Sequence, residues 1–254
     1  MNSTAREAHA RTGDQIAIPG DYQYRARYDG FAPQRFWHHA VLSEAERWLS
    51  PEPGDFLLDV GCGSGLLAAR LAEYPSTRVI AIDSNPAAIS FAAQHFQRSN
   101  LEFRLGLVDE LGAVSQDITK IAFLEVIEHL FPEQALHVLG TFHHLLRASG
   151  LLVISTPNAH SLWPMIEWGL DRSGFIPPMK AVQHVTLYSL ASLKDLAKRA
   201  GFRMVAYRTL NTVAPWLSTF NWKLALAMHR LEQARPHRLG SILLAVFQRD
   251  NVVI

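Results

Sequence analysis

The chain has a single cysteine, Cys62, among its 254 residues. One thiol excludes a disulfide framework and a thiolate metal site within the chain. An excess of either charge is also missing, because 24 lysines and arginines face 23 acids and give a formal net charge of +1. This balance provides no electrostatic basis for binding DNA, and it makes RNA an unfavoured partner.

Targeting and membrane-spanning segments are missing from the sequence as well. No N-terminal stretch combines a basic start with an apolar run, and no window has the length of a spanning helix. The composition, 48% hydrophobic and 19% charged, is that of a globular protein that buries a core. We therefore expect a soluble, cytoplasmic protein.

What the chain does contain is a series of short apolar strands separated by amphipathic helices. Strands are expected at residues 56–60, 78–83, 101–108, 117–124, 151–157, 202–210 and 241–250. Helices are expected at residues 33–49, 65–74, 85–99, 132–148, 189–201 and 215–233. Strands that alternate with helices imply an α/β fold in which a parallel sheet carries helices on both faces.

A glycine-rich stretch, LDVGCGSG, follows the first expected strand. Gly61, Gly63 and Gly65 lack side chains, so the backbone can turn tightly there and a ligand can approach it. The next helix would present N–H groups suited to a carboxylate or a phosphate. A dinucleotide fingerprint would need a third glycine at position 66, but Leu66 stands there.

The second expected strand ends in Asp83, about where an acid accepts hydrogen bonds from the hydroxyls of a ribose. That role is shared by NAD and by S-adenosylmethionine, so Asp83 alone does not discriminate between them. The alternative is a turn acid that caps the following helix, which Ser84 or Asn85 could do equally well.

LDVGCGSG together with AIDSN closely resembles the class I S-adenosylmethionine-dependent methyltransferases. The resemblance continues through FLEVIEHL, RASGLLVISTPN and HVTLYSLASLKDLAKRAGF, and covers roughly residues 50–210 and 240–249. Within that superfamily the chain is most similar to the group that contains the ubiquinone-biosynthesis O-methyltransferases. The resemblance implies a Rossmann-like sheet of seven strands, mostly parallel with an antiparallel last strand, with helices on both faces and inserted lid segments.

The resemblance also implies that S-adenosylmethionine is the cofactor, with the glycines along its methionine part and Asp83 on its ribose. Many relatives bind adenine with an acid where this chain has Leu107. Adenine is then held either by packing on Val108 with a backbone contact, or by Asp109 in a shifted loop. The expected cofactor-binding residues are Asp59, Gly61, Cys62, Gly63, Gly65, Asp83, Ser84, Val108, Asp109, Leu124 and Glu125.

The stretch EVIEH places Glu125, Glu128 and His129 at spacing i, i+3, i+4. If it is helical, all three face one side at the carboxyl edge of the sheet. They suit a divalent cation such as Mg²⁺, Mn²⁺ or Zn²⁺, with His184 as a fourth ligand. Without a metal, His129 or His184 is the expected general base. Alternatively, Glu125 only favours a helix start and Glu128 is a solvated surface residue.

Three segments lie around the expected methyltransferase domain of residues 51–254. They are the N-terminal segment and helix, 1–50, and two insertions at about 158–188 and 211–239. We expect all three to cap the acceptor, and the aromatic residues of the insertions indicate an apolar or aromatic acceptor. The alternatives are that these aromatics bury the insertions against the sheet or form a homodimer contact; contact of the second insertion with a membrane surface is less favoured.

The sequence therefore predicts an O-methyltransferase acting on a small apolar or aromatic hydroxylated metabolite in a biosynthetic pathway. N-methylation stays open, because an amine acceptor needs no strong base. A metal-dependent RNA 2′-O-methyltransferase is an alternative that requires a basic surface, against the nearly neutral net charge. A non-catalytic regulatory module that binds S-adenosylmethionine without turnover is another.

Overall fold

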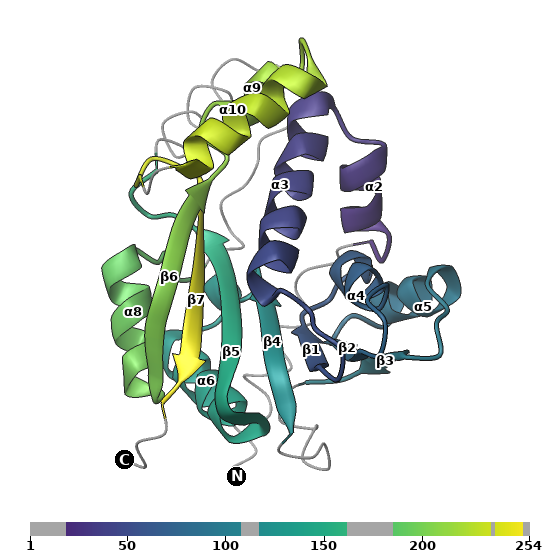
Figure 1. The fold of residues 1–254 in the computed structure, drawn as a ribbon, viewed down its shortest axis with the longest axis vertical. Helices are drawn as coiled ribbons and strands as arrows, with labels where there is room; N and C mark the ends of the chain where they lie inside the picture. Colours follow the sequence, from purple (N-terminus) through teal and green to yellow (C-terminus); the bar gives the residue numbers. More distant parts are fainter. Residues whose placement is uncertain (1–18, 108–116, 162–184, 235–236, 251–254) are drawn as a thin grey trace.

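The computed structural model describes residues 19–107, 117–161, 185–234 and 237–250. Its centre is a seven-stranded sheet with the order β3-β2-β1-β4-β5-β7-β6 (Figure 1). The strands are β1 (Phe56–Val60), β2 (Arg78–Asp83), β3 (Leu101–Leu105), β4 (Ile118–Leu124), β5 (Leu146–Pro157), β6 (Phe202–Leu210) and β7 (Ile242–Arg249). Neighbouring strands are parallel except at β7, which runs antiparallel to β5 and β6. The predicted sheet is confirmed, including its antiparallel last strand.

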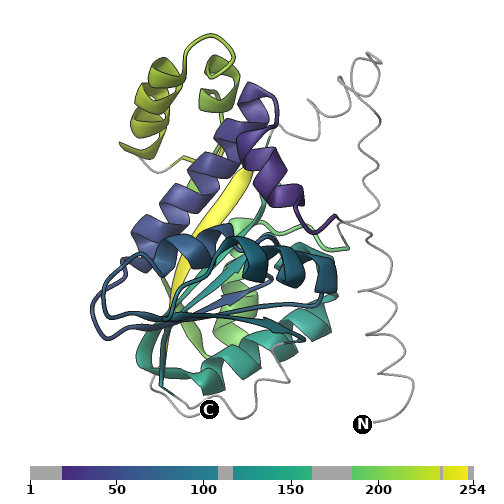
Figure 2. The same ribbon diagram turned by 90° about the vertical axis from the view of Figure 1, so that its right-hand side faces the viewer.

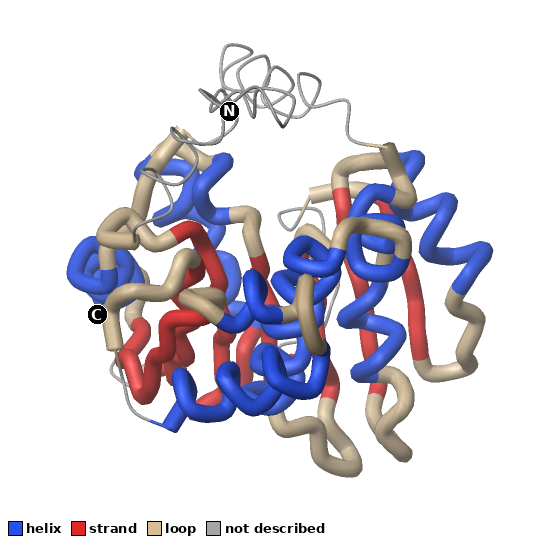
Figure 3. Tube along the Cα trace, turned by 90° about the horizontal axis from the view of Figure 1, so that it is seen from above, coloured by secondary structure: helices blue, strands red, loops and turns tan. Residues whose placement is uncertain are grey.

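Helices cover both faces of this sheet (Figure 2). On one face pack α3 (Ala32–Leu49) and α4 (Leu66–Leu71), and on the other pack α6 (Pro132–Leu145) and α8 (Leu190–Arg199). Successive side chains of a strand point to opposite faces, so Leu57 joins one core and Leu58 the other. Each such fully buried leucine contributes about 1.5–3 kcal/mol. Figure 3 looks down on the two helical layers from above, with the strands between them.

The helix boundaries differ from the expected ones in several places. The expected helix 85–99 ends earlier, as α5 (Pro86–His95), and β5 already begins at Leu146, where a helix was expected to continue. The expected helix 215–233 is two helices, α9 (Ala214–Leu217) and α10 (Trp222–Ala234). A short helix, α2 (Tyr22–Tyr28), was not predicted. In the described ranges, none of the helices has the length and apolar character needed to cross a membrane.

A buried ion pair joins the lower end of α3 to the sheet. The Nζ atom of Lys120 on β4 lies 2.5 Å from Oδ2 of Asp55 and also donates to the carbonyl of Ser50 at 2.7 Å. Both charged side chains are almost fully buried, so each depends on the other for its compensation. This pair fixes α3 against the ends of β1 and β4.

Asn158 connects the points where the two insertions, at about 158–188 and 211–239, meet the sheet. Its buried Nδ2 group donates to the carbonyls of Arg238 and Gly240 at 3.0 and 2.9 Å, and its backbone N–H donates to Ser241 at 2.8 Å. The first insertion leaves the sheet at this residue, and the second returns beside it. Most of the first insertion, residues 162–184, lies outside the described part of the chain.

Candidate functional site

The glycine-rich loop connects β1 to α4 at the carboxyl edge of the sheet. Gly61, Gly63 and Gly65 all have positive φ, at 72°, 51° and 79°. A Cβ atom at Gly61 would lie 2.3 Å from Cγ2 of Val126, and one at Gly65 would lie 2.8 Å from the ring of Phe103. The glycines are therefore required by the protein's own packing as well as by the tight turn that the sequence predicts.

The N–H groups of this loop are already engaged within the protein. Gly61 and Cys62 donate to Ile82, and Gly65 donates to Cys62. Gly63 and Ser64 donate to side chains, described below. The N–H groups of residues 61–65 therefore hold the turn, and the expectation of free N–H groups concerns the start of the next helix, α4, where it stays a prediction.

Asp83, at the end of β2, connects the glycine-rich loop to the start of α5. Its carboxylate accepts from the N–H of Gly63 and from the N–H of Asn85, both at 2.8 Å. Asn85 is the residue that caps α5, through bonds from Ala87 and Ala88. The half-buried carboxylate can still accept further bonds, since two oxygens offer about four acceptor positions. Asp83 thus fits the expected ribose contact while also holding two loops together.

Asp59 places a second carboxyl group beneath the same loop. Only 3% of the residue is exposed, and its Oδ2 atom has no hydrogen-bond partner among the described residues. Burial, and then the charge of Asp83, raise the pKa of Asp59 to about 7. The backbone N–H of Ala68 serves the carboxyl group, but Oδ2 stays unpartnered, and such an oxygen close to a second carboxylate favours a cationic ligand. S-adenosylmethionine carries an ammonium and a sulfonium, so the residues present fit this cofactor.

The remaining expected cofactor residues give less information. Burial, and then the charges of Asp59 and Asp83, raise the pKa of the Cys62 thiol well above its usual value, so a packing role fits better than a reactive one. Ser84 is exposed, and Leu124 is half-buried at the end of β4. Val108 and Asp109 lie outside the described residues, so the adenine contact stays a prediction.

The EVIEH stretch forms one 3-10 turn, η2 (Ile127–His129), instead of an α-helix. Glu125 precedes the turn with a left-handed backbone, φ 55°, and its carboxylate accepts from the Ser155 hydroxyl at 2.6 Å. Glu128 is only 1% exposed and accepts from the Thr156 hydroxyl at 3.1 Å. Glu128 is therefore a buried residue held by β5, and the alternative of a solvated surface acid is wrong.

The two acids lie close enough to influence each other. Burial raises the pKa of Glu125 to about 7, and burial together with the charge of Glu125 raises the pKa of Glu128 well above its usual value. His129 is half-buried in the same turn, and His184 lies outside the described residues. Within the described ranges, no three histidine, cysteine or acidic side chains are arranged to hold a metal ion. The four-residue metal site stays a prediction.

Gln23 is a residue of this site that the sequence analysis missed. It belongs to α2, which stands beside α3 and above α4 and α5 (Figure 1). Its Oε1 atom accepts from the N–H of Ser64 at 3.0 Å. The spacing of Tyr24 and Tyr28, one helical turn apart, was the available signal for α2. Nothing in the sequence indicated that this turn would reach the glycine-rich loop.

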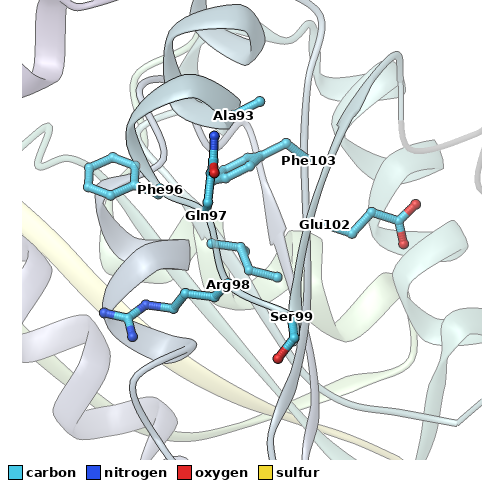
Figure 4. Close-up of a pocket in the computed structure, with 8 residues that line it drawn as sticks. Ala93, Phe96, Gln97, Arg98, Ser99, Glu102 and Phe103 are labelled. Carbon is cyan, nitrogen blue, oxygen red and sulfur yellow. The ribbon is translucent and has the colours of Figure 1, made fainter.

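A hollow of about 530 Å³ lies elsewhere, around the connection from α5 to β3 (Figure 4). It is lined by Ala93, Phe96, Gln97, Arg98, Ser99, Leu101, Glu102 and Phe103. This connection enters β3 at its amino end, whereas ligands of open α/β sheets bind beyond the carboxyl ends of the strands. The hollow therefore lies away from the carboxyl edge of the sheet, although its lining residue Phe103 also packs against Gly65.

Comparison with known proteins agrees with this geometry. The family described as "Methyltransferase domain" matches residues 28–207. A ubiquinone biosynthesis O-methyltransferase from Cereibacter sphaeroides is 33% identical over 123 residues, which is 46% of this chain and 49% of that protein. A ribosomal protein L11 methyltransferase from Symbiobacterium thermophilum is 28% identical over 138 residues, or 49% of this chain and 45% of that protein. The chain thus spans about half the length of these curated relatives.

A solved structure shares the fold over nearly the whole chain. Magnesium protoporphyrin IX methyltransferase from Synechocystis, with bound S-adenosylhomocysteine, superposes with a TM-score of 0.59 at 14% identity, covering 98% of this chain and 96% of that one. At this identity the likeness concerns the fold alone. The match of the family over residues 28–207, together with the sheet and its glycine-rich loop, places the chain in the methyltransferase domain family, as a class I S-adenosylmethionine-dependent methyltransferase.

Proposed function

We propose that this methyltransferase acts on a hydroxyl oxygen of a small apolar or aromatic metabolite in a biosynthetic pathway. The observation that carries the proposal is the pair of acids, Glu125 and Glu128, with His129 in the turn that follows β4. Val126 packs directly on Gly61, so this turn adjoins the glycine-rich loop. The relatives named as ubiquinone biosynthesis O-methyltransferases support oxygen as the acceptor atom.

When bound, S-adenosylmethionine supplies an electrophilic methyl group for a direct displacement. On the acceptor side, the chain must place the hydroxyl and take its proton. Hydrogen bonds from Ser155 and Thr156 fix the side chains of Glu125 and Glu128, and we assign the bond from the acceptor hydroxyl to Glu125, which is the less buried of the two. His129 receives the proton, and a positioned base contributes about 10²–10⁴-fold. Orientation of the hydroxyl adds a further large factor.

The cap supports an apolar acceptor, although not all of its aromatic residues are available. Trp222 packs on Phe36 of α3 with ring centroids 5.1 Å apart, so it fixes α10 in place. Trp216 and Phe220 keep 38% and 85% of their surface exposed. We assign acceptor contacts to Trp216 and Phe220, the exposed aromatic residues of the second insertion.

We propose separately that a divalent cation takes part in the reaction. Glu125, Glu128 and His129, with His184, would hold it, and the cation would bind the acceptor hydroxyl and lower its pKa. Carboxylate and imidazole ligands suit Mg²⁺, Mn²⁺ or Zn²⁺. This proposal predicts that turnover falls after chelation and returns when one of these cations is added back.

The test incubates the protein with cell extract and methyl-labelled S-adenosylmethionine, with and without a chelator, and identifies the labelled product by mass spectrometry. A small O-methylated molecule supports the proposal. A labelled amine, protein or RNA contradicts it, and donor binding without any labelled product supports the regulatory module instead. We expect His129→Ala to lower turnover by about 10²-fold or more with donor affinity nearly unchanged. His137→Ala, on an exposed position of α6, is the matched control.

A further inference from the structure

The segment from Gly20 to Tyr28 crosses both loops of the expected donor site. A Cβ atom at Gly20 would lie 2.2 Å from the carbonyl oxygen of Ala87, so the backbone there rests directly on the first turn of α5. The ring of Tyr24 packs edge-on against Phe91 of α5, with centroids 5.4 Å apart. Gly20 and Tyr24 thus attach the segment to α5, and Gln23 attaches it to the glycine-rich loop.

The carboxamide of Gln23 has a fixed orientation on this loop. Its Oε1 atom accepts from the N–H of Ser64 at 3.0 Å, so the amide oxygen and nitrogen are distinguished by this bond. A Cβ atom at Gly63 would lie 2.2 Å from Nε2, which shows how closely the amide approaches the backbone. Among the described residues, Nε2 donates no hydrogen bond, so an amide donor is left available at the loop.

This donor meets a need that the backbone N–H groups of residues 61–65 do not supply. S-adenosylmethionine carries a carboxylate on its methionine part. The loop N–H groups from Gly61 to Gly65 are used within the protein, and the nearby charged groups Asp59 and Asp83 are both acids. Two acids attract the ammonium and sulfonium but repel a carboxylate. An uncharged amide donor next to them accommodates the carboxylate without neutralising either acid.

We propose that Gln23 binds the carboxylate of S-adenosylmethionine through its Nε2 group, and that α2 belongs to the donor site rather than to the acceptor cap. The proposal rests on donor binding by this family and is independent of which acceptor is methylated. Gln23 is therefore a positioning and affinity-determining residue for the amino-acid part of the donor.

The test compares two ligands by isothermal titration calorimetry. S-adenosylhomocysteine has the carboxylate, whereas 5′-methylthioadenosine has the same nucleoside thioether without the amino-acid group. Gln23→Glu keeps the shape and the acceptor oxygen for Ser64 but replaces the donor nitrogen by an anionic oxygen. We expect it to weaken S-adenosylhomocysteine by about 10- to 100-fold, the range of a lost hydrogen bond to a charged group, with little change for 5′-methylthioadenosine.

Gln94→Glu is the matched control, because Gln94 lies on α5 and is exposed. It should bind both ligands as the wild type does. Gln23→Met, which lacks both hydrogen-bonding atoms, serves as a second variant if Gln23→Glu fails to fold, and it should show the same ligand selectivity.

An equal loss for both ligands would assign Gln23 a purely structural role and overturn the proposal, as would unchanged binding of S-adenosylhomocysteine. A wild-type protein that binds 5′-methylthioadenosine but gains no affinity from the amino-acid group would also overturn it. Failure to detect an O-methylated product leaves these binding results unaffected, so the two proposals fail separately.

Discussion

Replacing Asp83 by alanine removes a carboxylate that links two loops and that we expect to bind the ribose of the donor, and the two effects can be measured independently. In the free protein it accepts two backbone N–H bonds at 2.8 Å, from Gly63 and from Asn85. Hydrogen bonds to a charged group contribute roughly 1.5–3 kcal/mol each, and water replaces part of this in a half-exposed loop. We therefore expect Asp83→Ala to lower the free energy of unfolding by about 2–3 kcal/mol.

The corresponding thermal shift follows from the size of the chain. For about 250 residues, 1 kcal/mol corresponds to a change in Tm of about 2–4 °C, so Asp83→Ala should melt roughly 4–12 °C lower. The expected ribose bonds would be lost as well, and we predict that this weakens binding of S-adenosylhomocysteine by about 1–3 kcal/mol, or about 5- to 150-fold. Asp83→Asn keeps one acceptor oxygen, and both of its effects should be intermediate.

The assay pairs differential scanning calorimetry with isothermal titration of S-adenosylhomocysteine, performed well below the lower Tm. Ser84→Ala is the control, because Ser84 is adjacent and exposed. A variant with reduced Tm but wild-type affinity would refute the ribose contact and leave Asp83 as a structural link. A variant with weakened binding and an unchanged Tm would refute the claim that its two N–H bonds stabilise the loops.

Three further predictions concern the fold around the site. Gly61→Ala places a Cβ atom 2.3 Å from Cγ2 of Val126 and adds backbone strain of about 1–2 kcal/mol, because φ is positive at this position. Adding Val126→Ala should recover the part of the lost stability that comes from this clash, as measured by thermal melting. No recovery would contradict the contact. Lys120→Met leaves the buried carboxylate of Asp55 without its cation and should lower the free energy of unfolding, measured in urea, by about 3–5 kcal/mol. A loss below about 1 kcal/mol would contradict a buried ion pair. The double variant Lys120→Met, Asp55→Leu should regain most of the lost stability. Burial, and then the charge of Arg27, lower the pKa of His38 to about 4 from its usual 6.5. The unfolded chain therefore binds this proton more tightly than the folded one, and the free energy of unfolding should fall as the pH drops from about 6.5 to 4. His38→Gln should flatten this slope in Tm measured against pH, and an unchanged slope would argue against a neutral buried imidazole.

Much of the sheet could be predicted because its strands are short apolar runs between glycine and proline breaks. The strand ending in Asp83 and the turn at Gly61 follow from local sequence alone. The helix 215–233 was expected to be continuous because its apolar pattern does not stop at Phe220, yet Phe220 is exposed and the chain turns there. Apolar periodicity does not report this break, but Asn221 was an available local signal, because its side chain accepts from the N–H of Leu224 at 3.0 Å and so caps the start of α10.

The contacts within the site were harder to predict than its location. The acidic residues after the fourth strand were predicted, but the hydrogen bond that Glu128 accepts from Thr156 was not, because it joins residues 28 positions apart. The contact of Gln23 with Ser64 spans 41 positions. Nothing in a short window of sequence reports such pairings, because they depend on how helices and strands pack in three dimensions.

The amide of Asn158 has a consequence for how the two insertions can be exchanged. Its side chain, at the start of the first insertion, donates hydrogen bonds to the carbonyls of Arg238 and Gly240 at the end of the second. Lengthening or replacing one insertion alone would disturb these hydrogen bonds and with them the attachment of the other insertion to the sheet. Chimeras that transplant both insertions together with this asparagine should keep the sheet intact, and they would test whether the insertions select the acceptor.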